Sequence, residues 1–526
     1  MFRSVPIVRL ERILGEWWIF AIVVGLGWLF RLRAYVFNRS FWLDEAMLAN
    51  NVIYLSLEDL ATKPLMHKQV APTGFLVVTK LLASWIGDSE IVLRLVPFAA
   101  GMGLVLAACW LSFEAFDNSL PRLVFVGLVS FSQILIYYSG EFKQYILDVG
   151  FVMLMLAFGL FIYRLQTGTE VRTTPSSRVR LHIALFGAAG AVGIWFSQPL
   201  AFFLFAVGVS LFSQAVRQKK KGDLILLIGI GVGWAACFSL SLLLALRNVT
   251  ANQSLFEIWA AGSAPIPIKN LSDVKWYSDT VLAAVFLAFQ ERTVVGIVGQ
   301  PGWYSLANII LTIICALGGW RLVMRNQPLS FMLFLSSTAC LLTSALEYYP
   351  LRGRLLLFTV PIIFLLVSYS VDAVANQRLR FASYLLSLCL LGSAFLPTIK
   401  TFIEPAVVAD IRGVMRYMEE KRIPGEERVA VSQWSLPSYL YYAPRLGLND
   451  MKLYTVIGEN NDAEKFLQTV CASPDPGRIW LVFSLQMVET QRFLDRLQAT
   501  TSPLDQLERE GAGVYLFDFS SPGVCQ

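Results

Sequence analysis

The sequence predicts a polytopic α-helical membrane protein that ends in a small soluble α/β domain. Hydrophobic residues make up 56% of its 526 residues and charged residues only 15%, whereas soluble domains average about 25% charged residues. Stretches such as residues 92–113, 181–216 and 329–346 carry almost no charge, and roughly 20 apolar residues span a bilayer. Residues 399–526 return to ordinary charge density. We therefore expect a transmembrane domain over residues 1–398 and a soluble domain after it.

The membrane domain contains eleven apolar segments that are long enough to cross a bilayer. Two further stretches do not qualify, because residues 70–87 are short and contain Lys80, and residues 280–289 end at a charged cluster. No small-residue cleavage site follows the first segment, so we expect it to stay as an anchor. The expected spans lie at about residues 17–36, 92–115, 121–138, 144–163, 181–197, 199–216, 224–246, 304–322, 329–346, 355–370 and 382–398.

The loop charges predict the side on which each loop lies. Cytoplasmic loops are enriched in lysine and arginine, which gather here in alternate loops. The N-terminus is therefore predicted to be cytoplasmic, and the soluble domain to lie outside the plasma (inner) membrane. Two long loops, residues 37–91 and 247–303, fall on that outer side, and the net charge of +6 requires no nucleic-acid partner. The basic residues of the predicted inner loops are Arg3, Arg9, Arg12, Arg164, Arg172, Arg178, Arg180, Arg217, Lys219, Lys220, Lys221, Arg321, Arg325, Arg378 and Arg380.

Two arginines break this trend. Arg31 and Arg33 lie at the outer end of the first expected span. They would either extend to the lipid headgroups or face a polar cavity, and the sequence leaves both alternatives open.

The C-terminal region has the pattern of a small α/β domain. An amphipathic helix is expected over residues 406–421, and further helical patterns lie near residues 461–470 and 487–498. Strands alternating with helices indicate an α/β layer. The expected strands are Arg428 to Gln433, Arg478 to Phe483 and Gly513 to Phe519. No glycine-rich phosphate loop occurs in this region, so we expect a structural or acceptor-binding role.

Cys471 and Cys525 are the two cysteines of the soluble domain. A disulfide between them is plausible in an oxidising compartment, and two unpaired thiols are the equally weighted alternative.

Two groups of residues in the first loop could carry chemistry. Asp44 and Glu45 follow the first span closely, directly after Trp42. Adjacent carboxylates of this kind are candidates for acid–base catalysis. The alternative is a helix N-terminus that favours acidic residues, with Trp42 as a headgroup anchor. The second group runs from His67 to Phe75, and its proline and glycine indicate a turn.

The third group lies between two spans with barely any loop, from Tyr137 to Asp148. Glu141 and Lys143 should therefore lie at membrane depth. A charge in a span costs about 2.5–3.5 kcal/mol, so such residues are functional candidates by default. The alternative is that internal ion pairs hold the helices together.

The fourth group, Glu347 to Arg354, lies at the outer end of a span. Arg352 and Arg354 depart from the charge trend, so some interaction must offset their cost. A phosphate is the natural partner, because a guanidinium group binds it through two hydrogen bonds. The alternative is contact with phospholipid headgroups.

All four groups fall on the same predicted face, where they describe a cavity suited to a polyprenyl-phosphate sugar donor. The departing phosphate is stable near neutral pH, so no general acid is required. Asp44 or Glu45 could deprotonate the acceptor hydroxyl, and Arg352, Arg354 and Lys143 could stabilise the leaving phosphate. Direct displacement of this kind would invert the configuration at the sugar carbon.

These motifs resemble those of the GT-C membrane glycosyltransferases, near the protein O-mannosyltransferase and aminoarabinose-transferase branch. The resemblance covers about residues 15–400. It rests on the acidic pair Asp44-Glu45, a loose match from His67 to Gly74, the Ser-x-Glu-x-Lys-x-Tyr element of Ser139, Glu141, Lys143 and Tyr145, and the element of Tyr349, Pro350, Gly353 and Arg354, with Arg352 between them.

The resemblance implies an undecaprenyl- or dolichyl-phosphate sugar donor and a glycan, lipid or protein acceptor. It implies catalytic roles for Asp44, Glu45 and Glu141. Substrate binding would fall to His67, Lys143, Tyr145, Tyr349, Arg352 and Arg354.

Metal use varies within this family, so a divalent metal is possible. The chain has only two histidines and no spaced Asp-x-Asp at the acidic pair, and we expect no obligatory metal. The alternatives to a glycosyltransferase are a transporter or flippase of lipid-linked glycans, a glycan polymerase or ligase, and a non-enzymatic assembly subunit. A transporter would more often contain internal repeats or paired broken helices, and we find neither in the sequence.

Overall fold

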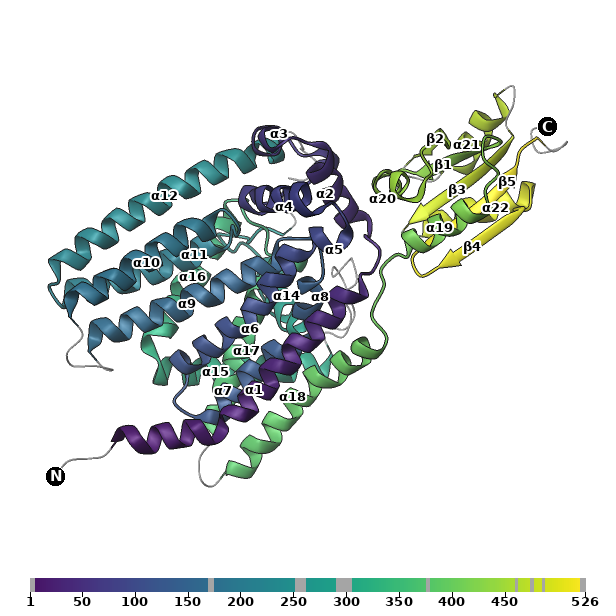
Figure 1. Ribbon diagram of the computed structural model, residues 1–526. Coiled ribbons are helices and arrows are strands. Elements are labelled where there is room, and N and C mark those ends of the chain that lie inside the picture. Colours follow the sequence, from purple (N-terminus) through teal and green to yellow (C-terminus); the bar gives the residue numbers. More distant parts are fainter. Residues whose placement is uncertain are drawn as a thin grey trace.

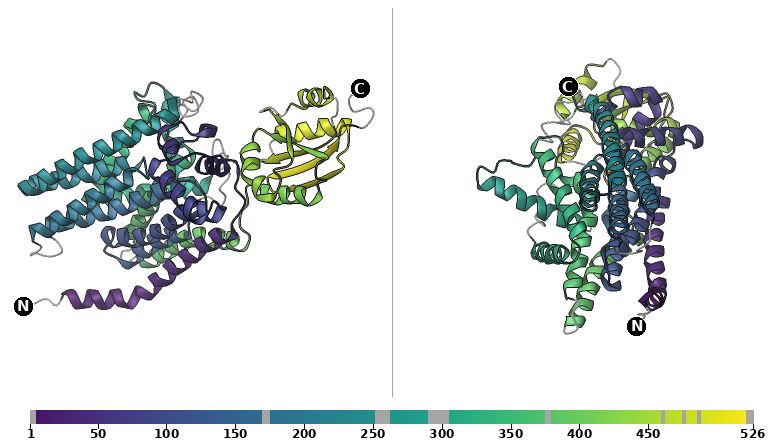
Figure 2. Two further views of the ribbon diagram at one scale, coloured as in Figure 1. Left: turned by 45° about the horizontal axis from the view of Figure 1, so that its top comes forward. Right: turned by 90° about the vertical axis from the view of Figure 1, so that its left-hand side faces the viewer.

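The computed structural model consists of a bundle of long helices with a small sheet domain beyond one end of it (Figure 1). Figure 2 shows that the helices run side by side and that the N-terminus lies at the end of the bundle remote from the sheet domain. The structure describes residues 5–168, 175–250, 262–289, 305–374, 379–458, 462–473, 477–484 and 488–520.

Nine helices among the described residues are long and apolar enough to cross a membrane, and a bent pair of helices adds a tenth candidate. The nine are α1 (Val5–Phe37), α6 (Leu95–Ala115), α9 (Tyr145–Thr167), α11 (Leu200–Arg217), α12 (Lys221–Thr250), α15 (Leu306–Arg325), α16 (Gln327–Ala345), η3 continued by α17 (Gly353–Thr359 and Val360–Val374) and α18 (Arg380–Ile403). The bent pair is α7 (Ser119–Phe131) and α8 (Gln133–Ser139), at 49° to each other.

The remaining expected span, residues 181–197, is also helical. It forms most of α10 (Ser176–Ile194), which packs between α9 and α12. Arg178 and Arg180 lie near the start of α10 and lower its mean hydropathy. Each of the eleven expected segments therefore lies on a helix, and the predicted fold class is confirmed.

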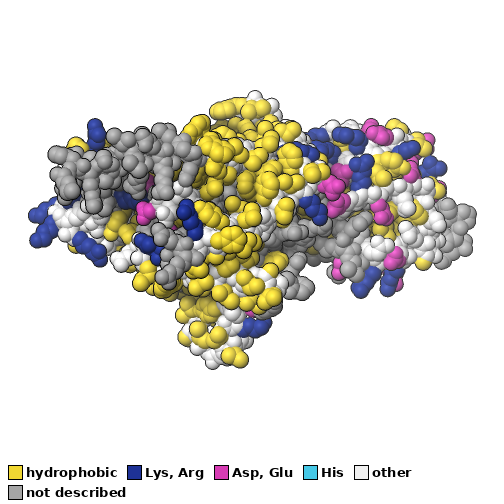
Figure 3. All heavy atoms as spheres, turned by 90° about the horizontal axis from the view of Figure 1, so that it is seen from below, with side chains coloured by type: hydrophobic (Ala, Val, Ile, Leu, Met, Phe, Trp, Pro, Cys, Tyr) yellow, Lys and Arg dark blue, Asp and Glu magenta, His cyan; other side chains and the backbone are white. Residues whose placement is uncertain are grey.

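The surface of the bundle matches a membrane environment. Apolar side chains cover the middle of the molecule in Figure 3, and charged side chains gather toward its two ends. Trp320 on α15 is 62% exposed and Leu388 on α18 is 70% exposed. Exposed apolar surface on this scale is characteristic of contact with lipid, so the chain is an integral membrane protein.

The break between α7 and α8 is stabilised by Arg31. Ser132 adopts an extended conformation there, so the last carbonyl groups of α7 lose their helical partners. The guanidinium of Arg31 donates hydrogen bonds of 3.0 Å to the carbonyl oxygens of Val129 and Ser130. Arg31 is fully buried, so it lies inside the bundle and not at the lipid headgroups.

The long first loop folds into short helices at one end of the bundle. They are α2 (Leu43–Tyr54), α3 (Leu57–Thr62), η1 (Met66–Lys68), α4 (Thr73–Ile86) and α5 (Glu90–Leu93). The two apolar stretches left out of the predicted spans lie on α4, which has 14 residues, and on α14 (Leu271–Phe289). Neither helix is among the candidate spans in the described residues.

The C-terminal domain is a five-stranded mixed sheet with the strand order β2-β1-β3-β5-β4. Strand β1 pairs in parallel with β2 and β3, and β5 pairs antiparallel with β3 and β4. Helices α19 and α20 pack on one face, and α21 and α22 pack on the other. The elements are α19 (Ile411–Lys421), β1 (Glu427–Ser432), α20 (Leu436–Tyr442), η5 (Pro444–Leu446), β2 (Lys452–Ile457), α21 (Ala463–Cys471), β3 (Arg478–Ser484), α22 (Val488–Thr500), β4 (Asp505–Arg509) and β5 (Ala512–Asp518).

The α/β architecture of this domain is as expected, but two strands were missed and one helix was placed too early. Strands β2 and β4 are edge strands. Strand β4 is largely polar and has no strand pattern, whereas β2 is rich in apolar and β-branched residues and could have been predicted. Helix α19 begins at Ile411 because the side chain of Asp410 accepts a hydrogen bond from the Gly413 N–H at 3.1 Å and caps the helix. Cys525 lies outside the described residues, so its pairing with Cys471 stays a prediction.

The sheet domain rests on the first loop through polar contacts. Arg412 on α19 forms an ion pair of 2.6 Å with Glu90, and the hydroxyl of Tyr442 on α20 donates to the same carboxylate. The Tyr442 hydroxyl also accepts the backbone N–H of Phe41 at 2.7 Å. Asn50 on α2 donates to the carbonyl of Pro437 at 2.9 Å. These contacts fix the start of α2, where the candidate site begins.

Candidate active site

Asp44, in the first turn of α2, is the centre of the site. Its Oδ1 accepts a hydrogen bond from Gln69 Nε2 at 3.2 Å and lies 3.1 Å from Lys143 Nζ. Its Oδ2 pairs with Nη1 of Arg354. The first loop, the connection between α8 and α9, and the start of η3 therefore meet at one carboxylate.

Glu45, the next residue, is fully buried and bonded to Arg94. Its two oxygens accept hydrogen bonds from Nε and Nη2 of Arg94 at 2.9 and 2.8 Å, and Oε1 also accepts the backbone N–H of Phe142 at 2.7 Å. Arg94 precedes α6 and donates further to the backbone oxygen of Arg39 at 2.6 Å. Because both oxygens of Glu45 are engaged, the geometry favours a positioning role for it over the role of base.

Glu141 lies in the short connection between α8 and α9 and is 1% exposed. Its Oε1 accepts a hydrogen bond from the indole N–H of Trp42 at 3.3 Å. Its Oε2 lies 3.9 Å from Nη2 of Arg39 and has no hydrogen-bond partner among the residues that the structure describes. Glu141 is therefore a buried carboxylate with one oxygen that accepts no hydrogen bond from the described residues.

The two cations beside Asp44 differ in accessibility. Lys143 is almost fully buried and donates to Gln69 Oε1 at 2.6 Å. The side chain of Arg354 is 36% exposed, and its Cζ lies 5.1 Å from the centre of the Tyr145 ring. Asp44 engages only Nη1 of Arg354. Within the described part of the chain the other guanidinium nitrogens stay available to a second anion.

Two residues of the fourth motif lie further from Asp44. Tyr349 is buried, donates its hydroxyl to the carbonyl of Leu355 at 3.0 Å, and packs on the ring of Phe202 at 5.5 Å. Arg352 is half-buried just before η3 and has no ion pair with any residue that the structure describes. Arg352, two residues before Arg354, is thus a cation without an ion pair in the described ranges.

His67 does not contact the acidic residues. It is half-buried and adopts a left-handed backbone conformation with φ at 57°. Gln69, two residues later, supplies the contact to Asp44 and Lys143 instead. Burial lowers the pKa of His67 and so favours its neutral form.

Sequence reasoning missed three residues of the site: Gln69, Arg94 and Arg39. Gln69 belongs to the run from His67 to Phe75 that was singled out, but an amide has no distinctive pattern. Arg94 lies inside the expected span of residues 92–115, and a charge within a span is a signal that could have identified it. Arg39 lies two residues after α1 in a segment without any motif.

Burial and neighbouring charges shift the pKa values of Glu141 and Asp44 in opposite directions. Burial raises the pKa of Glu141 to about 7, and Glu45 adds to the rise. Burial also tends to raise the pKa of Asp44, but Arg354, Lys143 and Gln69 together outweigh it and hold that pKa well below its usual range. Near neutral pH Asp44 is therefore fully ionised, whereas Glu141 exchanges a proton. Such a difference is expected of carboxyl groups with distinct roles.

The acidic residues do not fit a metal site. No three His, Cys, Asp or Glu side chains gather where they could hold a metal ion in the ranges that the structure describes. Asp44 is bonded to Arg354 and Lys143, and Glu45 to Arg94. We therefore assign no step of the chemistry to a metal.

Comparisons with known proteins bear on the fold. No protein-family model matches the chain, and no curated protein matches it either. The structure of the Archaeoglobus fulgidus oligosaccharyltransferase, tethered to an acceptor peptide that contains the NVT sequon, aligns with 96% of this chain and 74% of its own, at 12% identity and a TM-score of 0.50. The chain has the GT-C fold.

Two other structures align over similar lengths. Archaeal oligosaccharyltransferase AglB from Archaeoglobus fulgidus, in complex with an inhibitory peptide and a dolichol-phosphate, is 12% identical, with a TM-score of 0.48 and coverage of 95% of this chain and 74% of that one. ArnT from Cupriavidus metallidurans bound to undecaprenyl phosphate is 13% identical, with a TM-score of 0.48 and coverage of 97% and 99%. At these identities the likeness concerns the fold alone.

In this GT-C fold the candidate site lies at the end of the bundle that faces the sheet domain. Asp44 comes from the first loop, Glu141 and Lys143 from the turn between α8 and α9, and Arg354 from the start of η3. The resemblance drawn from the sequence motifs is thus confirmed at the level of the fold.

Proposed function

We propose that this chain is an inverting glycosyltransferase, which moves a sugar from a polyprenyl-phosphate donor to an acceptor on the extracytoplasmic face of the membrane. The meeting of Asp44, Lys143 and Arg354 beside the buried carboxyl group of Glu141 is the observation that carries this proposal. The GT-C fold supports it. The N-terminus is then cytoplasmic, as the arginine-rich loops at the opposite end of the bundle favour.

The donor phosphate binds on the side of Arg354. Arg352 and the guanidinium nitrogens of Arg354 that Asp44 does not engage have no ion pair within the described residues. They offer hydrogen bonds to phosphate oxygens, and an arginine can bind phosphate through two bonds at once. Lys143 adds a second positive charge at the far side of Asp44. Asp44 holds both cations in place before the donor arrives, so little reorganisation is needed as the phosphate becomes more negative.

Glu141 acts as the base. In its ionised form it accepts the proton of the acceptor hydroxyl through Oε2, the oxygen without a hydrogen bond in the described residues. The acceptor oxygen attacks the anomeric carbon, and the bond from that carbon to the phosphate oxygen breaks. The bonding electrons leave with the polyprenyl phosphate, whose charge Arg354 and Lys143 stabilise. Because this is a single displacement, the anomeric configuration inverts.

Asp44 is less suited to be the base, although the sequence pointed to it first. Its pKa is held low by Arg354 and Lys143 together, so it is a weak proton acceptor. We assign it the role of fixing Arg354 and Lys143. Glu45 holds Arg94, and through Phe142 it fixes the turn that carries Glu141.

A transfer assay tests the proposal. The purified protein in liposomes, supplied with radiolabelled polyprenyl-phosphate sugars and a panel of glycan, lipid and peptide acceptors, should release labelled product. Glu141→Gln should lower the rate by about 10²- to 10⁴-fold, the usual contribution of a general base, and Asp44→Asn should lower it as well. Transfer that survives both substitutions would overturn the proposal, and movement of intact lipid-linked sugar across the membrane would favour a transporter.

A further inference from the structure

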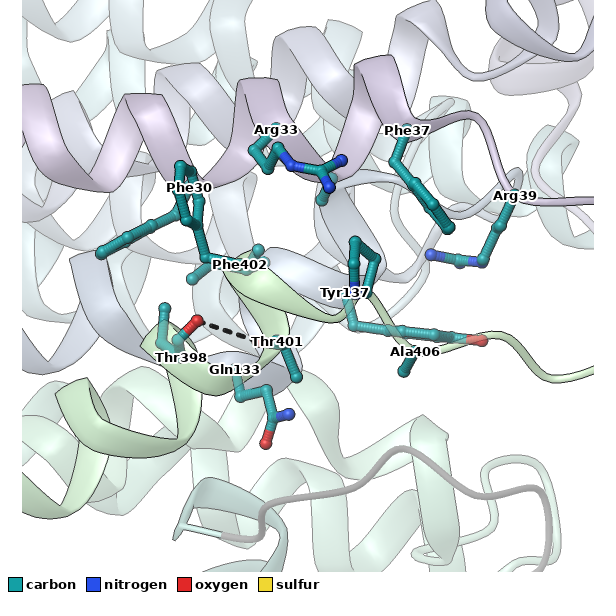
Figure 4. Close-up of a pocket in the computed structure, with 13 residues that line it drawn as sticks. Phe30, Arg33, Phe37, Arg39, Gln133, Tyr137, Thr398, Thr401, Phe402 and Ala406 are labelled. Atoms are coloured by element: carbon teal, nitrogen blue, oxygen red, sulfur yellow. Dashed lines mark hydrogen bonds between the residues drawn. The ribbon is translucent and has the colours of Figure 1, made fainter.

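A pocket opens beside the site, between α1, α8 and the end of α18 (Figure 4). Its empty space is about 560 Å³ when the part that is open to the surroundings is included. Its lining includes two arginines, Arg33 and Arg39, and the aromatic rings of Phe30, Phe37, Tyr137 and Phe402. In Figure 4 the side chains of Arg33 and Arg39 extend toward the pocket from its two sides.

Arg39 lacks the partners that a buried arginine requires. It is 6% exposed, yet its Nε and Nη2 donate no hydrogen bond to any residue that the structure describes. The nearby carboxylate of Glu141 lies at 3.9 Å, beyond hydrogen-bond distance, and the ring of Tyr137 lies 4.0 Å from its Cζ. A buried charge without hydrogen bonds is costly, so an anionic ligand would relieve this cost.

Arg33 adds a second positive charge to the same pocket. It is half-buried on α1, and its Cζ lies 5.3 Å from the ring of Phe37. Two guanidinium groups on one pocket match the geometry and the charge of a phosphate group, which accepts several hydrogen bonds at once.

The surroundings of the pocket are apolar and belong to two candidate membrane spans. Leu32 and Val36 on α1 are 45% and 62% exposed, and Leu396 and Ile403 on α18 are 69% and 68% exposed. These side chains face the lipid in a protein that crosses a membrane. A ligand that enters here therefore comes from the membrane and has an apolar tail as well as an anionic head.

The pocket and the cations assigned to the donor phosphate meet different carboxylates of the site. Arg39 approaches Glu141 from the pocket, whereas Arg354 and Lys143 bind Asp44. A transfer between two substrates requires two such positions, and the base must face the acceptor. This arrangement assigns the pocket to the acceptor.

We propose that the pocket between α1, α8 and α18 binds the phosphate-bearing head of a membrane lipid, and that this lipid is the acceptor of the transferred sugar. The evidence for lipid binding is the pocket itself, whereas the acceptor role rests on the proposed glycosyltransferase function. Arg33 and Arg39 hold the lipid phosphate, and the rings of Phe30 and Phe402 contact the first carbons of its tails.

Photocrosslinking tests the binding without any transfer reaction. The full-length protein is reconstituted in phosphatidylcholine vesicles that contain a phosphatidic acid probe with a diazirine in its acyl chain, and labelled peptides are identified by mass spectrometry. We expect labels on α1 and α18 around the pocket. Arg33→Gln should reduce this labelling by about tenfold, and Ala406→Trp, at an exposed lining position, should block it by filling the pocket.

The matched control is Arg325→Gln, an exposed arginine at the opposite end of the bundle, which should leave the labelling unchanged. Arg33 and Ala406 are not buried, so these variants should fold, and an unchanged melting temperature verifies this. Equal labelling of the wild type and both pocket variants, or equal labelling by an uncharged diacylglycerol probe, would overturn the binding site.

The acceptor role has its own readout. With phosphatidic acid as acceptor, Arg33→Gln should raise KM for the acceptor and leave KM for the donor unchanged. Competition by undecaprenyl phosphate for the crosslink, or transfer to peptides alone, would overturn the acceptor assignment. Absence of all transfer together with intact crosslinking would instead count against the glycosyltransferase function and leave the lipid site in place.

Discussion

Arg354 forms an ion pair with Asp44, although 310 residues separate the two along the chain. The pair joins the first turn of α2 to the first turn of η3, at the end of the bundle that faces the sheet domain. Lys143 contacts the same carboxylate from the turn before α9. Asp44 therefore organises two cations that would otherwise repel each other.

The shape of the Arg354 side chain should matter as well as its charge. In Arg354→Lys an ammonium group can still pair with Asp44, but it lacks the planar fork that binds phosphate through two bonds. We expect kcat/KM for the polyprenyl-phosphate sugar to fall by about 10- to 100-fold, the equivalent of one or two charge-assisted hydrogen bonds. Steady-state kinetics of transfer in liposomes measure this.

Arg321→Lys is the matched control, because Arg321 forms an ion pair of 2.9 Å with Asp372 on α17 away from the site. Its kinetics should stay close to those of the wild type. Equal losses in the two variants would indicate a general effect on the bundle and would contradict phosphate binding by Arg354.

The pH dependence of transfer should report Glu141. Its pKa is raised to about 7, so the carboxyl group is protonated below that pH and cannot accept a proton. The value of log kcat/KM should therefore rise with a slope of about one up to pH 7 and level off above it. Asp44 stays ionised throughout this range, because its pKa is lowered.

Glu141→Gln should abolish the rise of log kcat/KM with pH and most of the transfer rate. Asp372→Asn should leave that rise unchanged. A profile that keeps its midpoint near pH 7 in the residual activity of Glu141→Gln would assign the titration to another group and contradict the proposed base.

The ion pair of Glu45 and Arg94 should contribute to stability. Both side chains are at least 99% buried and share two hydrogen bonds. Removing one partner of a buried ion pair costs about 3–5 kcal/mol, so Glu45→Gln should lower the free energy of unfolding by that order. Denaturant titration in detergent, followed by tryptophan fluorescence, measures it.

The exposed ion pair of Glu464 and Arg496 in the sheet domain provides the control. Exposed pairs contribute about 0.2–1 kcal/mol, so Glu464→Gln should be nearly neutral. If Glu45→Gln were as stable as that control and merely inactive, Glu45 would have a direct chemical role and the positioning role would be wrong.

Tyr442 should couple the sheet domain to the site. Its hydroxyl accepts the buried N–H of Phe41 and donates to Glu90, and Tyr442→Phe leaves that N–H unpaired at a cost of about 1–3 kcal/mol. We expect faster hydrogen exchange at the start of α2 and a several-fold lower kcat. Tyr454→Phe, which removes an exposed hydroxyl contact to Thr469, should do neither. Unchanged exchange in Tyr442→Phe would contradict the coupling.

The fold could largely be predicted from the sequence, because a bilayer imposes long apolar segments and excludes charge from them. Helix α10 is less apolar than the other spans, because it carries exposed charged residues. The edge strand β4 could not be predicted, since it is largely polar and an edge strand needs little apolar surface. The bend at Ser132 was also not foreseen, because it depends on hydrogen bonds from Arg31, which is 98 to 99 residues away in sequence.

The candidate site could be predicted only in part. Charges that are costly in a membrane drew attention to Glu141, Lys143 and Arg354, and the structure brings them together around Asp44. The partners of these charges were missed, because which arginine approaches which carboxylate depends on helix packing. Arg94, 49 residues beyond Glu45, is such a partner.

A structure of the protein in complex with undecaprenyl phosphate tests the central claim most directly. We predict that the phosphate lies within hydrogen-bond distance of Arg354 or Arg352, next to Asp44 and at the end of the bundle that faces the sheet domain. A phosphate bound at the opposite end of the bundle, among the arginine-rich loops, would contradict both the proposed site and the proposed orientation in the membrane.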